Sequence, residues 1–88
     1  MKIQAEVSLY PLRQATLSEA IYRFVEDLRA DGLTVEMGTM STHVSGEFRA
    51  LFAVLGRAFE TAAAGGAVVA ALKVTNAFPV VEPHREQA

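Results

Sequence analysis

The sequence predicts an α+β sandwich in which two helices cover one face of a four-stranded antiparallel sheet. Apolar residues follow, in order, the spacing of a strand, a helix, two strands, a helix and a final strand. The chain has 88 residues, 51% of them hydrophobic, which is enough for one core but not for two. It has no cysteine, so packing rather than disulfide bonds must stabilise it.

The first strand is expected from Lys2 to Leu12 and the first helix after it. Apolar and polar residues alternate in the strand, as is typical of one buried face, and Pro11 ends it. The segment 16–19, Thr-Leu-Ser-Glu, matches a capping box, in which a hydroxyl and a carboxylate satisfy free backbone amides. Helical spacing of apolar residues then predicts about four turns, stopping at Gly32.

The middle of the chain predicts two neighbouring strands and a second helix. The strands are expected over 33–39, with a bulge or bend at Gly38, and over 40–44, before Ser45 and Gly46. The helix is expected from about Glu47 to Ala64, with Ser45 as its cap and 65–66 as its glycine terminator. Its apolar residues recur at three and four positions and are expected in the core, namely Phe48, Leu51, Phe52, Leu55, Phe59 and Ala62.

The last strand is expected over 67–75, and the segment 76–79, Asn-Ala-Phe-Pro, breaks it. We therefore predict a single domain over 1–79 and a loose C-terminal tail over 80–88. The order of elements is that of the ferredoxin-like βαββαβ fold. In that arrangement we expect the first and last strands at the centre of the sheet, and one sheet face without a covering layer.

The uncovered face mixes small apolar side chains with hydrogen-bonding ones. Strand parity places two sets of residues on it, Gln4, Glu6, Ser8 and Tyr10 from the first strand and Val69, Ala71, Lys73 and Thr75 from the last. A solvated face usually carries more long charged residues, and a dimer face more large apolar ones. The pattern alone is compatible with a wet face or with a modestly polar oligomer contact.

Charge and hydropathy exclude several classes of partner. Eight basic and ten acidic residues give a net charge of -2, without a basic cluster, so we expect no binding to nucleic acid or to anionic lipid. The N-terminal residues are not expected to form a signal peptide, and the longest nearly apolar run, 62–72, is shorter than the roughly 20 residues that cross a bilayer. We therefore predict a cytoplasmic protein without membrane insertion.

Three segments resemble the YkoF-like family of thiamine-binding and hydroxymethylpyrimidine-binding proteins. They are Val-Ser-Leu-Tyr-Pro at 7–11, Met-Ser-Thr-x-x-x-Gly at 40–46, and Asn-Ala-Phe-Pro at 76–79. The resemblance implies a ferredoxin-like domain whose open face packs against another such domain, with thiamine or its pyrimidine part held between them and no reaction catalysed. Because this chain has one domain, the resemblance implies a homo-oligomer, either a dimer or a tetramer.

The predicted ligand-binding residues come from two sources. The matching segments supply Ser8, Tyr10, Ser41, Thr42 and Asn76, and strand parity adds Gln4 and Glu6. Amides, carboxylates and hydroxyls can pair with an aminopyrimidine, and a carboxylate or an aromatic face favours the positive thiazolium ring. Thr42→Val is accordingly expected to weaken ligand binding with little loss of fold. Each residue also has an ordinary structural interpretation as a strand or turn residue.

The same residues bear on other possible functions. An enzyme is disfavoured because His43 and His84 lie far apart in sequence without metal-like partners, and Arg13 lacks a glycine-rich phosphate cradle. We expect no catalytic residue, no metal and no cofactor other than the ligand. An RNA-recognition module would place aromatic residues on the central strands of the open face and surround them with positive charge, whereas the last strand offers Val69, Ala71 and Lys73. A regulatory amino-acid-binding domain of the ACT type and a purely structural homo-oligomer remain open alternatives.

Overall fold

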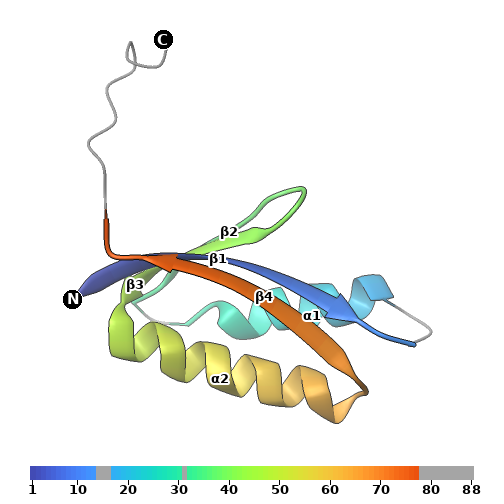
Figure 1. Ribbon diagram of the computed structural model, residues 1–88. Coiled ribbons are helices and arrows are strands. Elements are labelled where there is room, and N and C mark those ends of the chain that lie inside the picture. The colour runs from blue at the N-terminus through green and yellow to red at the C-terminus, as the bar shows by residue number, and fades with distance from the viewer. Residues whose placement is uncertain (14–16, 31, 78–88) are drawn as a thin grey trace, which may run out of the picture.

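The computed structural model of the chain describes residues 1–13, 17–30 and 32–77. Its elements are β1 (Lys2–Pro11), α1 (Leu17–Leu28), β2 (Thr34–Met37), β3 (Thr42–Glu47), α2 (Phe48–Ala64) and β4 (Val68–Thr75). The strands form one antiparallel sheet, and both helices lie on the same side of it (Figure 1). This is the predicted ferredoxin-like βαββαβ fold.

The order of strands across the sheet is β2-β3-β1-β4, which corrects one expectation. The last strand, β4, lies at an edge, and β3 rather than β4 shares the centre with β1. The crossover through α1 leaves room for a strand between β1 and β2, and the short β2–β3 turn places β3 there. β3 then pairs with β1 from Lys2 opposite Glu47 to Val7 opposite Thr42.

The core lies between the helices and one face of the sheet. The predicted alternation of β1 is confirmed, because its apolar residues are buried and the polar residues between them are only partly covered. The buried core residues are Ile3, Ala5, Val7 and Leu9 from β1, Val44 from β3, Phe24, Val25 and Leu28 from α1, and Leu51, Val54 and Ala58 from α2. No helix in the described part of the chain is long and apolar enough to cross a membrane.

Both helices begin or end differently from the prediction. α1 ends at Leu28 rather than at Gly32, and the chain then turns through Gly32 with a φ of 86°, a left-handed value that favours glycine. The predicted capping box includes residue 16, which lies outside the described residues. α2 is capped by Glu47 instead of Ser45, because the Glu47 carboxylate accepts a hydrogen bond from the Arg49 backbone N–H at 2.9 Å.

β3 is longer than predicted and continues through Ser45 and Gly46 to Glu47. This strand position requires glycine because the chain at 32–33 passes close to it. A Cβ atom at Gly46 would lie 2.9 Å from the Gly32 carbonyl oxygen. β2 is shorter than predicted, and Gly38 belongs to the turn after it, where its N–H donates to the Ser41 carbonyl at 2.8 Å.

The expectation that Phe48, Phe52 and Phe59 lie in the core is wrong. Their residue surfaces are 38%, 36% and 37% exposed, whereas that of Leu51 is 1% exposed. α2 presents Leu51, Val54 and Ala58 to the core. Its three phenylalanines lie on an adjacent flank of the helix that is only partly covered. On this flank the rings of Phe48 and Phe52 pack against each other with centroids 5.1 Å apart.

Leu51→Ala is therefore expected to lower the free energy of unfolding by about 2–5 kcal/mol, because it leaves a cavity in the core. Phe52→Ala removes a larger side chain but is expected to lower it clearly less, because that ring is partly solvated already. Chemical denaturation of both variants tests this. A larger loss for Phe52→Ala than for Leu51→Ala would contradict the assignment of helix faces.

Candidate functional site

The register of the sheet builds two rows of polar side chains on the open face. Directly opposite residues in antiparallel strands share a face, so the pairing sets which side chains are neighbours. One row crosses all four strands through Glu36, His43, Glu6 and Lys73, and the next through Thr34, Ser45, Gln4 and Thr75. Glu6 therefore stands between a histidine and a lysine at the middle of the bare face.

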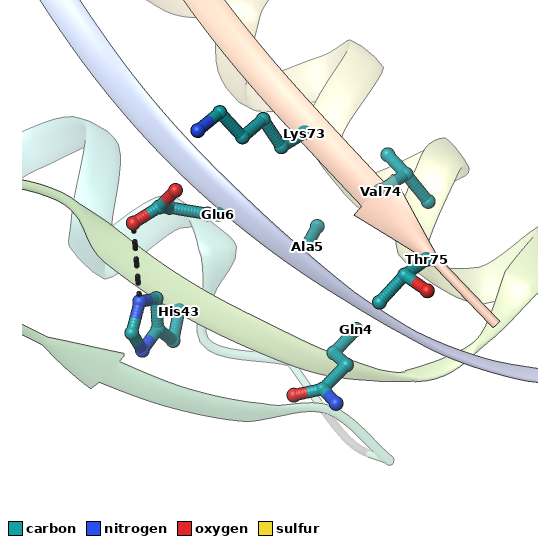
Figure 2. Close-up of a pocket in the computed structure, with 7 residues that line it drawn as sticks. All are labelled: Gln4, Ala5, Glu6, His43, Lys73, Val74 and Thr75. Atoms are coloured by element: carbon teal, nitrogen blue, oxygen red, sulfur yellow. Dashed lines mark hydrogen bonds and ion pairs between the residues drawn. The ribbon is translucent and has the colours of Figure 1, made fainter. Parts of the chain in front are cut away.

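A shallow pocket of about 460 Å³ lies over these rows, and we call it the face pocket. Figure 2 shows its lining, which comes from β1, β3 and β4: Gln4, Ala5, Glu6, His43, Lys73, Val74 and Thr75. Its volume is within the range of small-molecule sites. Its polar groups include a carboxylate, an amide, an imidazole and an ammonium, which together can bind a polar heteroaromatic compound.

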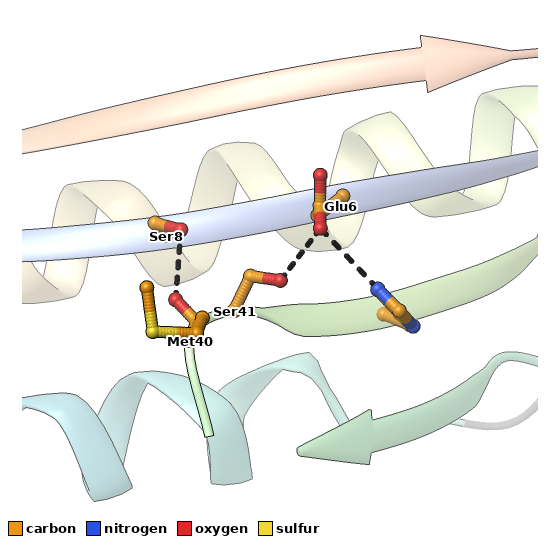
Figure 3. Close-up of polar contacts among 5 residues, drawn as sticks. Glu6, Ser8, Met40 and Ser41 are labelled. Atoms are coloured by element: carbon orange, nitrogen blue, oxygen red, sulfur yellow. Dashed lines mark hydrogen bonds and ion pairs between the residues drawn. The ribbon is translucent and has the colours of Figure 1, made fainter. Parts of the chain in front are cut away.

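The Glu6 carboxylate is held in place by two neighbours (Figure 3). The Ser41 hydroxyl donates to Glu6 Oε2 at 2.8 Å, and His43 Nε2 lies 3.5 Å from the same oxygen. The Ser41 hydrogen bond, and after it that of His43, holds the pKa of Glu6 below its ordinary value of 4.5. Glu6 therefore presents a negative charge to the face pocket at neutral pH.

The same contacts fix the β2–β3 turn to the open face. Besides the bond from Ser41, the Ser8 hydroxyl donates to the Met40 carbonyl at 3.4 Å (Figure 3). Residues 38–41 are thereby tied to β1 at two points. The Met40 side chain itself is solvent-exposed on this turn.

The other end of the face pocket adjoins the residues after β4. The Gln4 amide donates to the Ala77 carbonyl at 3.3 Å, and the Thr75 hydroxyl accepts from the Ala77 N–H at 3.0 Å. Asn76 lies between these residues in sequence and is exposed, but it is not among the residues that line the pocket. The predicted segment 76–79 is described only as far as Ala77.

A second, smaller pocket of about 230 Å³, the edge pocket, lies where β1 extends past the start of β3. It is lined by Val7, Ser8, Leu9 and Tyr10 of β1, by Ile21, Phe24 and Val25 of α1, and by residues 37–42. Most of this lining is apolar. The edge pocket thus lies between the end of β1, helix α1 and the β2–β3 turn.

Six of the seven predicted site residues line one of the two pockets, and Asn76 lines neither. Ser8, Tyr10, Ser41 and Thr42 line the edge pocket, and Gln4 and Glu6 line the face pocket. Thr42 is buried and pairs with Val7, so its side chain lies on the helix side of the sheet, away from Glu6. Ser41 joins the two pockets, since it lines one and donates to a carboxylate of the other.

His43 is the residue of the face pocket that the sequence interpretation passed over. The sequence gives His43 no metal-like partner, and only the pairing of β1 with β3 places it beside Glu6. Strand parity in β3 could have indicated it if the register had been known. His84 lies outside the described residues. Within residues 1–13, 17–30 and 32–77, no group of three His, Asp or Glu side chains is arranged to hold a metal ion.

Comparison with known proteins gives one family. A family model described as thiamine-binding protein matches residues 5–76, which confirms the resemblance carried by the three sequence segments. No curated protein matches the sequence significantly.

Similar solved structures include a hypothetical protein from Methanocaldococcus jannascii, with 27% identity and a TM-score of 0.79 over 91% of this chain and 84% of that one. A protein from Streptococcus pneumoniae has 25% identity and a TM-score of 0.77, over 99% and 94% of the two chains. A Thermotoga maritima protein described as a candidate for thiamine biosynthesis or salvage has 20% identity and a TM-score of 0.79, over 99% and 98%.

The lowered pKa of Glu6 predicts a pH-dependent contribution to stability. Because the folded-state pKa lies below the ordinary value of 4.5, ionised Glu6 stabilises the fold above about pH 4.5, and this contribution is lost as the pH falls through the lowered pKa. Glu6→Gln is expected to lower the free energy of unfolding at neutral pH, with the difference from the wild type narrowing in acid. Denaturant unfolding across a pH series measures this difference.

Glu60→Gln, an exposed change on α2, is the matched control and is expected to alter stability little at any pH. A Glu6→Gln difference that stays constant or widens as the pH falls would contradict the geometry at Glu6.

Proposed function

The chain belongs to the thiamine-binding protein family, and on that premise we propose that it binds thiamine or its hydroxymethylpyrimidine part in the face pocket, without catalysing a reaction. The observation that carries this proposal is the Glu6 carboxylate, which is held ionised by Ser41 and His43 at the centre of the open sheet face. The description of the Thermotoga maritima structure points in the same direction.

The chemistry of the ligand suits this carboxylate. The thiazolium ring of thiamine carries a permanent positive charge, which a nearby carboxylate favours without any proton transfer. The aminopyrimidine ring presents hydrogen-bond donors and acceptors side by side, which Glu6 and the Gln4 amide can meet as a pair. These two residues are cross-strand neighbours of Lys73 and Thr75, which close the β4 side of the face pocket.

The face pocket lies open to one side, whereas small-molecule sites usually bury about 70–90% of the ligand surface. We propose that a second copy of the chain packs on the open face and supplies the missing wall. The rows of hydroxyl, amide and charged groups fit this role, because they can pair with the ligand at the centre and with the second copy around it. The binding site is then incomplete in a single chain.

Glu6→Gln is expected to weaken the binding of thiamine by about tenfold or more, because a charge-assisted contact at the centre of the pocket is lost; tenfold corresponds to ~1.4 kcal/mol. Isothermal titration calorimetry with thiamine and with hydroxymethylpyrimidine measures this. Glu36→Gln is the matched control, since Glu36 stands in the same row but outside the pocket lining, and it is expected to change the affinity little. Equal losses for the two variants would contradict a specific role of Glu6.

Thr42→Val distinguishes the two pockets. The Thr42 side chain lies on the helix side of the sheet, so binding in the face pocket predicts that the substitution leaves thiamine affinity unchanged. The sequence-based expectation that it weakens binding would hold only if thiamine bound in the edge pocket, which Thr42 lines. Titrating Thr42→Val beside Glu6→Gln gives the comparison. If Thr42→Val weakens binding and Glu6→Gln does not, the ligand lies in the edge pocket and the proposed site is wrong.

A further inference from the structure

Lys73 brings to the face pocket a positive charge that no described side chain neutralises. It lies directly opposite Glu6 in the pairing of β1 with β4, and it lines the pocket. The side chains of Lys73 and Glu6 extend in the same direction along the face (Figure 2). Among the described residues, however, Lys73 donates no hydrogen bond and its ammonium forms no ion pair. An ammonium group has three N–H donors, and those of Lys73 are available to a ligand.

Glu6 has binding capacity left as well. Ser41 and His43 both contact its Oε2 atom, and Oε1 accepts no hydrogen bond from the described residues. The lowered pKa of Glu6 is due mainly to the hydrogen bonds from Ser41 and then His43, and the charge of Lys73 contributes less. Lys73 therefore acts on Glu6 through its electric field and not through a direct contact. The face pocket offers a free carboxylate oxygen and a free ammonium on neighbouring strands.

The other basic groups near the face pocket do not share this position. His43 lies between two carboxylates, those of Glu6 and Glu36, and is already in contact with Glu6 Oε2. Lys73 has a cross-strand neighbour on one side only, because β4 is an edge strand. None of the described arginines lines the pocket. Lys73 is therefore the basic residue of this site that is best placed to bind an anionic group.

A ligand that carries only a positive charge suits half of this arrangement. A thiazolium ring beside Glu6 also lies near the ammonium of Lys73, the cross-strand neighbour, and like charges repel each other. If a second copy covers the open face, as the proposed function requires, an ammonium left without an anion is costly to bury. A ligand that brings a cation to Glu6 and an anion to Lys73 removes both penalties.

We propose that Lys73 determines specificity and that the face pocket selects the phosphate monoester of thiamine over thiamine itself. This inference rests on the proposed function, because it takes the face pocket to be the thiamine site. A phosphate monoester carries a charge of about −1.5 to −2 at neutral pH and has three strong acceptor oxygens. In the ester, the phosphate group sits on the short hydroxyethyl arm of the thiazolium ring. A ring at Glu6 therefore brings the phosphate within reach of the next strand, about 4.8 Å away.

Thr75 adds a second donor on the same strand. It lines the face pocket two residues after Lys73, so both side chains lie on the open face of β4. The Thr75 hydroxyl oxygen accepts from the Ala77 N–H at 3.0 Å, and its own O–H donates to no described residue. An ammonium and a hydroxyl on one side of the pocket match the several acceptor oxygens of a phosphate group.

Isothermal titration calorimetry with thiamine and with thiamine monophosphate tests the proposal. The wild-type chain is expected to bind the monoester at least about tenfold more tightly than thiamine. Lys73→Met is expected to lose this preference and to bind thiamine at least as tightly as the wild type does, because a repelling charge is gone. Lys73→Arg keeps the charge and is expected to keep the preference.

Lys2→Met is the matched control. Lys2 is the only other lysine of the chain, and it stands on the same face of β1 as Glu6 but outside the pocket lining. This substitution is expected to leave the ratio of the two affinities unchanged. Inorganic phosphate alone is the second control ligand. It lacks the ring that contacts Glu6, so it is expected to bind at least about tenfold more weakly than the monoester.

Several outcomes overturn the role of Lys73. Equal wild-type affinities for thiamine and its monoester do so while leaving the proposed function intact, whereas binding of neither ligand overturns the proposed function as well. A preference that survives Lys73→Met, or that Lys2→Met abolishes equally, places the phosphate elsewhere. Loss of both ligands in Lys73→Met makes Lys73 a general binding or structural residue. Inorganic phosphate that binds as tightly as the monoester shows an anion site independent of Glu6.

Discussion

The structure depends on the burial of one face of the sheet under both helices, which leaves the other face without a covering layer (Figure 1). The side chains of β1 alternate accordingly. Ile3, Ala5, Val7 and Leu9 fill the core, and the side chains between them face outward. Every group of the face pocket owes its position to that alternation or to the pairing that extends it across the sheet. The bare face is therefore a direct consequence of how the core is built, and it is the surface available for binding.

The open face is organised by a few contacts that extend from one strand to the next. Ser41 and His43 reach Glu6 from the turn before β3 and from β3 itself, so the carboxylate is fixed by residues more than 30 positions away in sequence. Ser8 holds the same turn through the Met40 carbonyl. The charge of the site and the shape of the neighbouring turn are thus coupled, and a change at Ser41 affects both pockets.

The sequence predicted the fold well and the site in part, and the differences have physical causes. Alternation in β1 and helical spacing in α2 are local signals, so the elements and the buried face of β1 could be predicted. The placement of Thr42 and His43 depends on the register between β1 and β3, which no local pattern records. The edge position of β4 likewise depends on which strands pair. The capping of α2 by Glu47 depends on the nearby N-terminal amine, which lies 2.9 Å from Glu47 Oε2.

A nuclear magnetic resonance titration of the isotope-labelled chain with thiamine shows whether thiamine binds on the bare face above Glu6. We expect the backbone amide signals that move most to belong to Gln4, Glu6, His43 and Lys73, which line the face pocket. Shifts concentrated instead at Phe24, Val25 and Thr42 would place the ligand in the edge pocket, and a spectrum unchanged by saturating thiamine would show that the chain does not bind thiamine.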